Sequence, residues 1–219
     1  MIIQNSDFEV RNEGRPVYAG DTYFGFFTKQ ALADQVGIRD AIPYFPTPDE
    51  IGKGLKFDYP EGLLFPDAQL RMVDRIELFV PDGGPNGLGF IRGTKGIDPR
   101  EWFFKAHFFE DPVWPGSLGL ESFLQLIRVV AVNRWGIGVW AESPDIQPTG
   151  PGIRNFTMVP GENHSWLYRG QVLPSDKLVT VQASITSIDD INLRIRADGF
   201  LMVDERVIYQ INDFEIMAT

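Results

Sequence analysis

The sequence predicts an α+β fold in which a curved antiparallel sheet wraps around one buried central helix. Two observations carry this prediction: apolar and polar residues alternate over most of the last third of the chain, and residues 117–133 are apolar nearly all round. Alternation with a period of two is typical of a half-buried strand, whereas a helix that is apolar on every side must be buried. The 219 residues suffice for one main core with an appended fragment.

The N-terminal segment predicts a hairpin of its own. Residues 8–27 (FEVRNEGRPVYAGDTYFGFF) and 200–217 (FLMVDERVIYQINDFEIM) share an order of strand, polar turn, Val-Tyr or Ile-Tyr, and Phe-bearing strand. We therefore expect residues 1 to about 28 to be the last two strands of a preceding unit of the same kind. A short helix at 29–36 and a Pro-rich linker at 42–48 are expected to follow. The alternative is that two unrelated hairpins share this pattern.

Two apolar runs in the first half, 70–80 and 88–93, flank the turn-forming cluster PDGGPNG at 81–87. The glycines of such a cluster can also form a phosphate-binding loop, but that loop leads from a strand into a helix. Here the following residues still read as strand, so a hairpin turn is the favoured interpretation. The next aromatic run, 102–110 (WFFKAHFFE), is interpreted as a strand.

The helix is predicted over 117–133 (SLGLESFLQLIRVVAVN), directly after Pro115-Gly116. Three strands are expected beyond it, at 179–185, 191–195 and 207–211. Their joins, 187–190 and 204–206, are short and rich in turn-forming residues. Adjacent strands joined in this way pair antiparallel, as a meander.

Composition excludes several classes of function. The chain has no cysteine, which removes disulfides, zinc–thiolate sites and thiol nucleophiles and agrees with a cytoplasmic location. A net charge of -10 disfavours nucleic acid as a partner. We expect neither a membrane span nor a secretory leader, because the sequence lacks a long apolar run and a basic, then apolar, N-terminus. No cofactor or metal is expected.

The segment from His107 to Glu121, HFFEDPVWPGSLGLE, is the most specific motif in the chain. It resembles the signature of bacterial 3-hydroxydecanoyl-type thioester dehydratases, the FabA-like family, which reads H-F-x-x-D-P-V-x-P-G-x-L-G-x-[DE]. The wording SLGLES and the segment YRGQ at 168–171 are more similar still to dehydratase domains of bacterial polyunsaturated fatty acid synthases. This resemblance covers residue 55 to the C-terminus, and it implies a hotdog fold. The expected domains are 1–45, the tail of a preceding hotdog unit plus linker, and 46–219, the dehydratase domain.

Dehydration of a 3-hydroxyacyl thioester needs a base for the C2 proton, an acid for the departing hydroxyl and a dipole for the enolate charge. His107 is a competent base near neutral pH. Glu121 lies at the start of the apolar helix, where burial favours the neutral acid. Gly116 has no side chain to keep a thioester carbonyl from the backbone N–H groups at the positive end of the helix.

The resemblance implies further roles. In the family the histidine is oriented by the carbonyl of the position matching Val113, and the acid by a glutamine one turn later, here Gln125. The decanoyl-type enzymes usually carry Asp and Cys where this chain has Glu121 and Ser117, which puts double-bond isomerisation in doubt. The implied partner is an acyl carrier protein with a phosphopantetheine-linked acyl substrate.

The related dehydratases build each cavity from two hotdog units. We therefore expect a homodimer, or pairing with another hotdog unit, in which His107 and Glu121 of one cavity come from different units. For carrier docking, Arg100, Lys105 and Arg128 are candidate basic residues.

Two other functions stay open. A hotdog acyl-thioesterase also uses a helix carboxylate but activates water, and a non-catalytic hotdog unit would only scaffold a synthase. Ser117 is not interpreted as a hydrolase nucleophile because the sequence around it does not match Gly-x-Ser-x-Gly.

Overall fold

A computed structural model describes residues 2–28, 30, 35–63, 67–136 and 155–219. The chain divides into two compact units, an N-terminal unit, Met1–Val36, and a main unit, Gly37–Thr219. The N-terminal unit contains β1 (Ile2–Asn12) paired antiparallel with β2 (Arg15–Phe26). The predicted helix at 29–36 falls mainly outside the described residues. The division precedes the boundary expected at residue 45, because Ile38 N already donates to Val207 O of the main unit at 2.9 Å.

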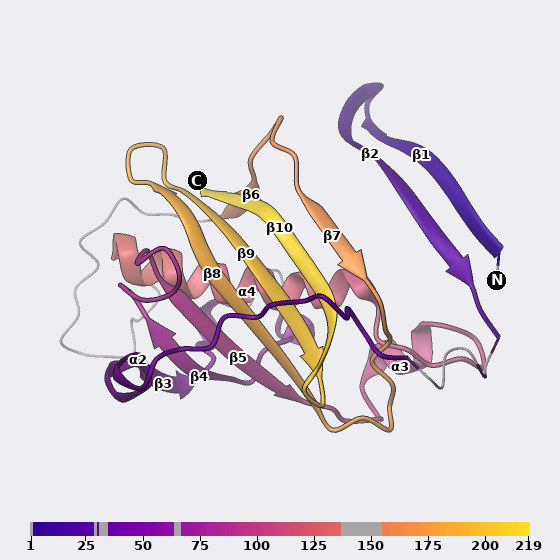
Figure 1. The fold of residues 1–219 in the computed structure, drawn as a ribbon. Helices are drawn as coiled ribbons and strands as arrows, with labels where there is room; N and C mark the ends of the chain where they lie inside the picture. Colours follow the sequence, from indigo (N-terminus) through magenta and orange to yellow (C-terminus); the bar gives the residue numbers. More distant parts are fainter. Residues whose placement is uncertain (1, 29, 31–34, 64–66, 137–154) are drawn as a thin grey trace. The chain divides into compact units, whose positions relative to one another are not determined.

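The main unit is built on an eight-stranded antiparallel sheet in the order β3-β4-β5-β8-β9-β10-β6, with β7 also paired to β10 (Figure 1). Its strands are β3 (Leu55–Asp58), β4 (Arg75–Val80), β5 (Phe90–Gly96), β6 (Phe156–Met158), β7 (Ser165–Tyr168), β8 (Leu178–Asp189), β9 (Arg194–Val203) and β10 (Arg206–Ala218). The helical segments are α2 (Pro48–Lys53), η1 (Glu61–Leu63), η2 (Ala68–Leu70), α3 (Trp102–Ala106) and α4 (Gly116–Trp135).

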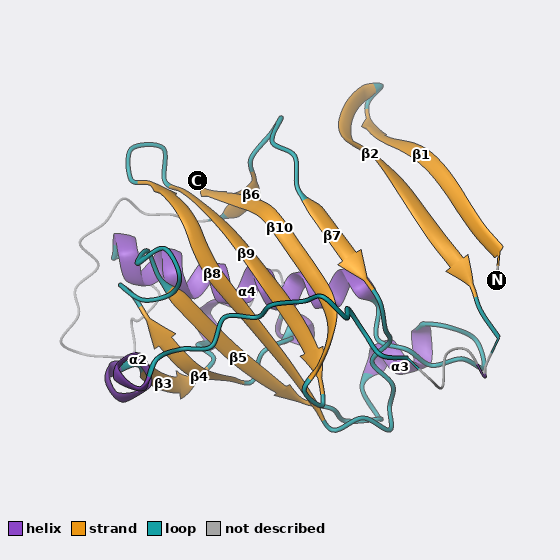
Figure 2. Ribbon diagram, viewed as in Figure 1, coloured by secondary structure: helices purple, strands orange, loops and turns teal. Residues whose placement is uncertain are grey.

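The long helix α4 runs across the curved sheet (Figure 2). Its side chains form the main core with those of the strands. Phe123, Leu126 and Ile127 of α4 are fully buried, as are Val181 of β8 and Ile195 of β9. Burial of apolar area at about 25 cal/mol per Å² is the main force that holds the helix against the sheet. This arrangement is the hotdog fold, and it confirms the predicted class.

Several local predictions are confirmed. The expected helix at 117–133 lies within α4, which ends on Gly136 in the left-handed conformation at φ 63°. The glycine-rich cluster at 81–87 joins β4 to β5, so it is a strand-to-strand turn and not a phosphate loop. The C-terminal strands β8, β9 and β10 form the predicted antiparallel meander.

The prediction of a strand over 102–110 is wrong. Residues 102–106 form the short helix α3, and a loop follows. The reason is that the neighbouring rings of Phe103 and Phe104 are both buried in one apolar cluster with Trp114. A strand points successive side chains to opposite faces, whereas a helical turn lets both rings enter the same core.

The join between β8 and β9 also lies later than predicted. The segment at 187–189 still belongs to β8, and the turn covers 190–193. Ile191, assigned to a strand by its alternation with Leu193 and Ile195, is 92% exposed at that turn. Leu193 adopts a left-handed φ of 52°, which a strand does not allow.

None of the helices described in the structure is both long and apolar enough to cross a membrane.

Candidate active site

The loop from His107 to Val113 is closed by backbone hydrogen bonds. Val113 N donates to His107 O at 2.9 Å. Inside this pair, Phe108 N donates to Asp111 O at 3.1 Å and Asp111 N donates to Phe108 O at 3.3 Å. The loop begins where α3 ends, because His107 N donates to Phe103 O at 2.9 Å. The imidazole is therefore fixed at the base of a closed loop.

One hydrogen bond determines the tautomer of His107. Its Nδ1 atom lies 3.0 Å from the carbonyl oxygen of Val113. A carbonyl oxygen can only accept, so Nδ1 carries the hydrogen and Nε2 of the neutral ring keeps its lone pair. The ring is partly exposed and lies against Phe108, with ring centroids 3.8 Å apart. Nε2 is thus the atom that can take a proton from a bound molecule.

Glu121 lies in the first two turns of α4 beside a buried cation. Arg128 Nη1 donates to Glu121 Oε1 at 2.7 Å, and Nη2 donates to Oε2 at 3.4 Å. The side chains of Arg128 and Glu121 are only 8% and 14% exposed, respectively. Gln125 Nε2 also donates to Oε1, at 3.0 Å. Arg128 and Gln125 thus hold the two carboxyl oxygens of Glu121 in place.

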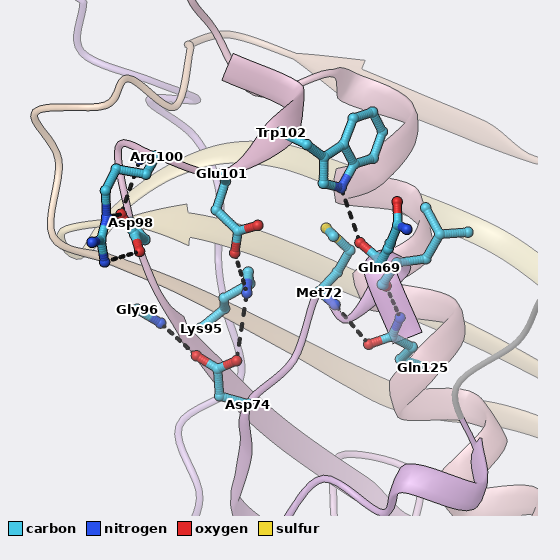
Figure 3. Close-up of polar contacts among 11 residues, drawn as sticks. Gln69, Met72, Asp74, Lys95, Gly96, Asp98, Arg100, Glu101, Trp102 and Gln125 are labelled. Carbon is cyan, nitrogen blue, oxygen red and sulfur yellow. Dashed lines mark hydrogen bonds and ion pairs between the residues drawn. The ribbon is translucent and has the colours of Figure 1, made fainter. Parts of the chain in front are cut away.

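Gln125 joins α4 to the segment that leads into β4. Its Oε1 accepts from Met72 N at 3.0 Å, and its Nε2 donates to Leu70 O at 2.6 Å (Figure 3). The side chain of Gln125 is fully buried. Because backbone groups hold both ends of the amide, its orientation is determined, and the second hydrogen of Nε2 is directed at Glu121.

The same segment supports α3, which precedes His107. Trp102 Nε1 donates to Gln69 O at 3.1 Å (Figure 3). At the start of α3, the carboxylate of Glu101 lies 3.0 Å from the ammonium group of Lys95 on β5. The Lys95 side chain is only 6% exposed. These contacts fix α3 to the sheet, and through it the position at which the His107 loop begins.

The space above Gly116 is filled differently from the prediction. A Cβ at position 116 would coincide with the phenolic oxygen of Tyr168 on β7, and a Cβ at Gly119 would meet the ring of Tyr209 on β10. The two tyrosine rings pack edge to face with centroids 4.2 Å apart. Burial raises the pKa of both hydroxyls, which keeps them neutral. Tyr168 therefore occupies the space on the side-chain side of Gly116, which the sequence interpretation had left open.

The two hydrogen bonds expected from the sequence are thus present: His107 bonds to Val113, and Glu121 bonds to Gln125. Among the described residues, no hydrogen bond or ion pair joins His107 directly to Glu121. The sequence interpretation missed Arg128 as a partner of Glu121 and assigned it to a docking surface, which its burial contradicts. Glu121 and Arg128 are seven residues, or two helical turns, apart, and this spacing could have predicted that they lie on the same face of the helix.

Replacing Gln125 by Leu is expected to lower the free energy of unfolding by about 2–4 kcal/mol, because the buried Met72 N and the part-buried Leu70 O lose their partner. Urea unfolding measures this loss. Ser122→Ala is the matched control: Ser122 is equally buried on α4 but bonds only to Gly119 O of the same helix. Equal losses for the two variants would contradict the bridging role of Gln125.

Comparison with known proteins places these features in a wider context. A model of the FabA-like domain matches residues 65–212, which include the His107 loop, α4 and most of the sheet. A polyunsaturated fatty acid synthase polypeptide of Thraustochytrium sp. is 32% identical over 240 aligned positions. That alignment covers 99% of this chain and 15% of the relative, so the chain spans a small part of the relative's length.

Solved structures also resemble the chain. The dehydratase heterocomplex ApeI:P from Xenorhabdus doucetiae aligns with a TM-score of 0.46 and 11% identity, over 73% of this chain and 90% of that one. A probable thioesterase from Bartonella henselae aligns with a TM-score of 0.41 and 12% identity, over 59% of this chain and 91% of that one.

Proposed function

We propose that this chain, which belongs to the FabA-like family, removes water from (3R)-3-hydroxyacyl thioesters on an acyl carrier protein to give 2-enoyl thioesters. The setting would be the synthesis of fatty acids, polyunsaturated fatty acids or polyketides. The observation that carries the proposal is the hydrogen bond from His107 Nδ1 to Val113 O at 3.0 Å. This bond leaves Nε2 of His107 free to act as the base, and the same motif supplies the carboxyl group of Glu121.

In the proposed first step, Nε2 of His107 takes the C2 proton, and the electron pair of the broken C–H bond forms the double bond between C2 and C3. The C3–O bond breaks, and Glu121 gives its proton to the departing hydroxyl, which leaves as water. Negative charge on the thioester oxygen is met by backbone N–H groups near Gly116 at the start of α4. His107 then returns its proton through solvent, and Glu121 is reprotonated.

Arg128 has a place in this scheme. After Glu121 has given its proton, the carboxylate remains in a site that is only partly open to water. The guanidinium at 2.7 Å stabilises this carboxylate, and Gln125 holds its Oε1 atom in place. Arg128 therefore favours proton donation to the substrate.

The partner is proposed to be an acyl carrier protein with a phosphopantetheine-linked substrate. Of the three candidate docking residues, Arg100 and Lys105 are exposed around α3, and the Arg100 side chain is 87% exposed in an ion pair with Asp98. We propose that two hotdog units, in a homodimer or with another unit, complete each cavity. The proposal is limited to dehydration, because Glu121 and Ser117 stand at the two positions where the decanoyl-type enzymes usually carry Asp and Cys.

Product analysis distinguishes dehydration from thioester hydrolysis. With a 3-hydroxyacyl thioester, we expect the ultraviolet-absorbing 2-enoyl thioester to accumulate without free thiol. The physical reason is that the site offers an oriented base and an acid for elimination. Mass spectrometry and a thiol reagent measure the two outcomes in one reaction. Free thiol without enoyl product would assign the chain to the rival class, the acyl-thioesterases.

The other alternative is a non-catalytic scaffold. A scaffold has no need for an oriented imidazole, whereas His107 and Glu121 both retain specific hydrogen-bond partners here. Absence of both products under these conditions would favour it.

A further inference from the structure

Lys95 of β5 is a buried cation that the proposed reaction does not use. Its side chain is only 6% exposed, and β5 lies inside the sheet between β4 and β8. Burial of an ammonium group is costly unless the group is paired, and apolar side chains of similar size fill such a place at less cost. The partners of Lys95 therefore indicate what its charge does.

Two carboxylates lie against the ammonium group of Lys95, and they belong to different parts of the main unit (Figure 3). Nζ is 3.5 Å from Oδ1 of Asp74 and 3.0 Å from Oε1 of Glu101. Asp74 is itself fixed to β5, because its N donates to Thr94 O at 2.8 Å and its Oδ2 accepts from Gly96 N at 3.0 Å. The contact with Asp74 thus stays within the sheet, whereas the contact with Glu101 reaches α3.

The short helix α3 has few means of fixing its own direction. It consists of five residues and spans only about 7–8 Å. The rings of Phe103 and Phe104 are buried, but apolar contacts are not directional. Directional contacts come from the indole of Trp102, which donates to Gln69 O at 3.1 Å, and from the carboxylate of Glu101. The ion pair of Glu101 is therefore one of the contacts that fix where α3 begins.

Glu101 and His107 lie at the two ends of α3. Phe104 N donates to Glu101 O at 3.2 Å in the first turn, and His107 N donates to Phe103 O at 2.9 Å in the last. A change in the place of Glu101 is therefore carried through this helix to the imidazole.

We infer that Lys95 is a positioning residue for His107 and that it acts through Glu101. The inference rests on the proposed function, in which Nε2 of His107 takes the C2 proton. Such a transfer needs the reacting atoms about 3–3.5 Å apart, and a displacement of about 1 Å costs up to about 100-fold in rate. The ion pair of Lys95 with Glu101 holds the start of α3 against the sheet, and so keeps the imidazole in place.

This ion pair is expected to affect the rate more than the stability. A buried ion pair contributes little net free energy of folding when it is compared with apolar side chains of the same volume. The side chain of Glu101 is 26% exposed, so water solvates its carboxylate when the ammonium group is absent. Removal of the charge at Lys95 therefore leaves the fold intact but loosens the start of α3.

Three variants of the full chain test the inference in the dehydration reaction. Lys95→Met removes the ammonium group, and we expect kcat to fall by about 10–100-fold with little change in KM. Glu101→Gln should lower kcat by a smaller factor, because an amide oxygen binds an ammonium group less strongly than a carboxylate does. Asp74→Asn is the matched control, since it neutralises the carboxylate beside Lys95 that is bonded to β5. Its kcat should stay close to that of the natural chain.

The double variant Lys95→Met with Glu101→Gln shows whether the two side chains act as one unit. It should be no slower than Lys95→Met alone, because the contact is already lost in that variant. Losses that multiply in the double variant, or an equal fall in kcat for Asp74→Asn and Glu101→Gln, would overturn the inference. A natural rate for Lys95→Met would also overturn it.

NMR spectroscopy tests the place of the imidazole without turnover, since the chain has only two histidines. We expect the ring signals of His107 to shift in Lys95→Met and Glu101→Gln but not in Asp74→Asn. The ring signals of His164, which packs against Phe214, should stay in place in all three variants. Unshifted His107 signals in Lys95→Met would contradict the positioning role. Shifted signals in a protein whose natural chain forms no enoyl product would instead contradict the proposed function and leave the positioning contact standing.

Discussion

His107→Ala is expected to lower the rate of dehydration by about 10²–10⁴-fold, because the group oriented to take the C2 proton is lost. The fold should persist, since the imidazole is partly exposed and its loop is closed mainly by backbone hydrogen bonds. Initial rates with a 3-hydroxyacyl thioester and a thermal unfolding curve measure the two effects separately.

The other histidine of the chain is the matched control. His164 precedes β7 and packs against Phe214, with ring centroids 5.2 Å apart. Burial lowers the pKa of this imidazole, so it is neutral at pH 7 and His164→Gln removes no charge there. We expect that variant to keep most of the activity. Near-normal turnover by His107→Ala would exclude His107 as the base.

Arg128→Met is expected to lower the free energy of unfolding by about 1–3 kcal/mol, because it removes the guanidinium donors from both oxygens of Glu121 in a largely buried site. Dehydration should slow as well, since the carboxylate formed by proton donation is no longer stabilised. Urea unfolding and initial rates at pH 7 are the measurements.

The double variant Arg128→Met with Glu121→Gln separates the ion pair from simple packing. Glu121→Gln removes one of the oxygens that Arg128 bonded, so part of the lost stability should return, although activity should not. If Arg128→Met alone were as stable as the natural chain, the contact between Arg128 and Glu121 at 2.7 Å would contribute nothing to stability.

The sequence was most informative where the pattern is periodic or the motif is specific. The continuous apolar run of α4 reflects a helix that is buried on all faces. The alternation in β8 reflects a strand that is buried on one face. The aromatic run before His107 has no such period, and only tertiary packing of Phe103 and Phe104 into one cluster decides for a helix. Local patterns therefore predict the elements better than their joins.

The contacts of the site were only partly predictable. The bond from His107 to Val113 follows from resemblance, since a loop of this length does not determine its own closure. Tyr168 lies far from Gly116 in the chain, so its position above that glycine depends on how β7 pairs with β10. Arg128 was predictable in principle, because a charge two turns after Glu121 on an apolar helix needs a buried partner.

The most direct test of the central claim, that His107 and Glu121 act together on one substrate, is to mix the inactive variants His107→Ala and Glu121→Ala and measure dehydration. If two chains build each cavity, random exchange of protomers should restore about a quarter of the sites, by symmetry counting. Each variant alone should stay inactive. A mixture that remains inactive although the chains exchange would contradict a shared cavity, and substantial activity of Glu121→Ala alone would contradict the role of the acid.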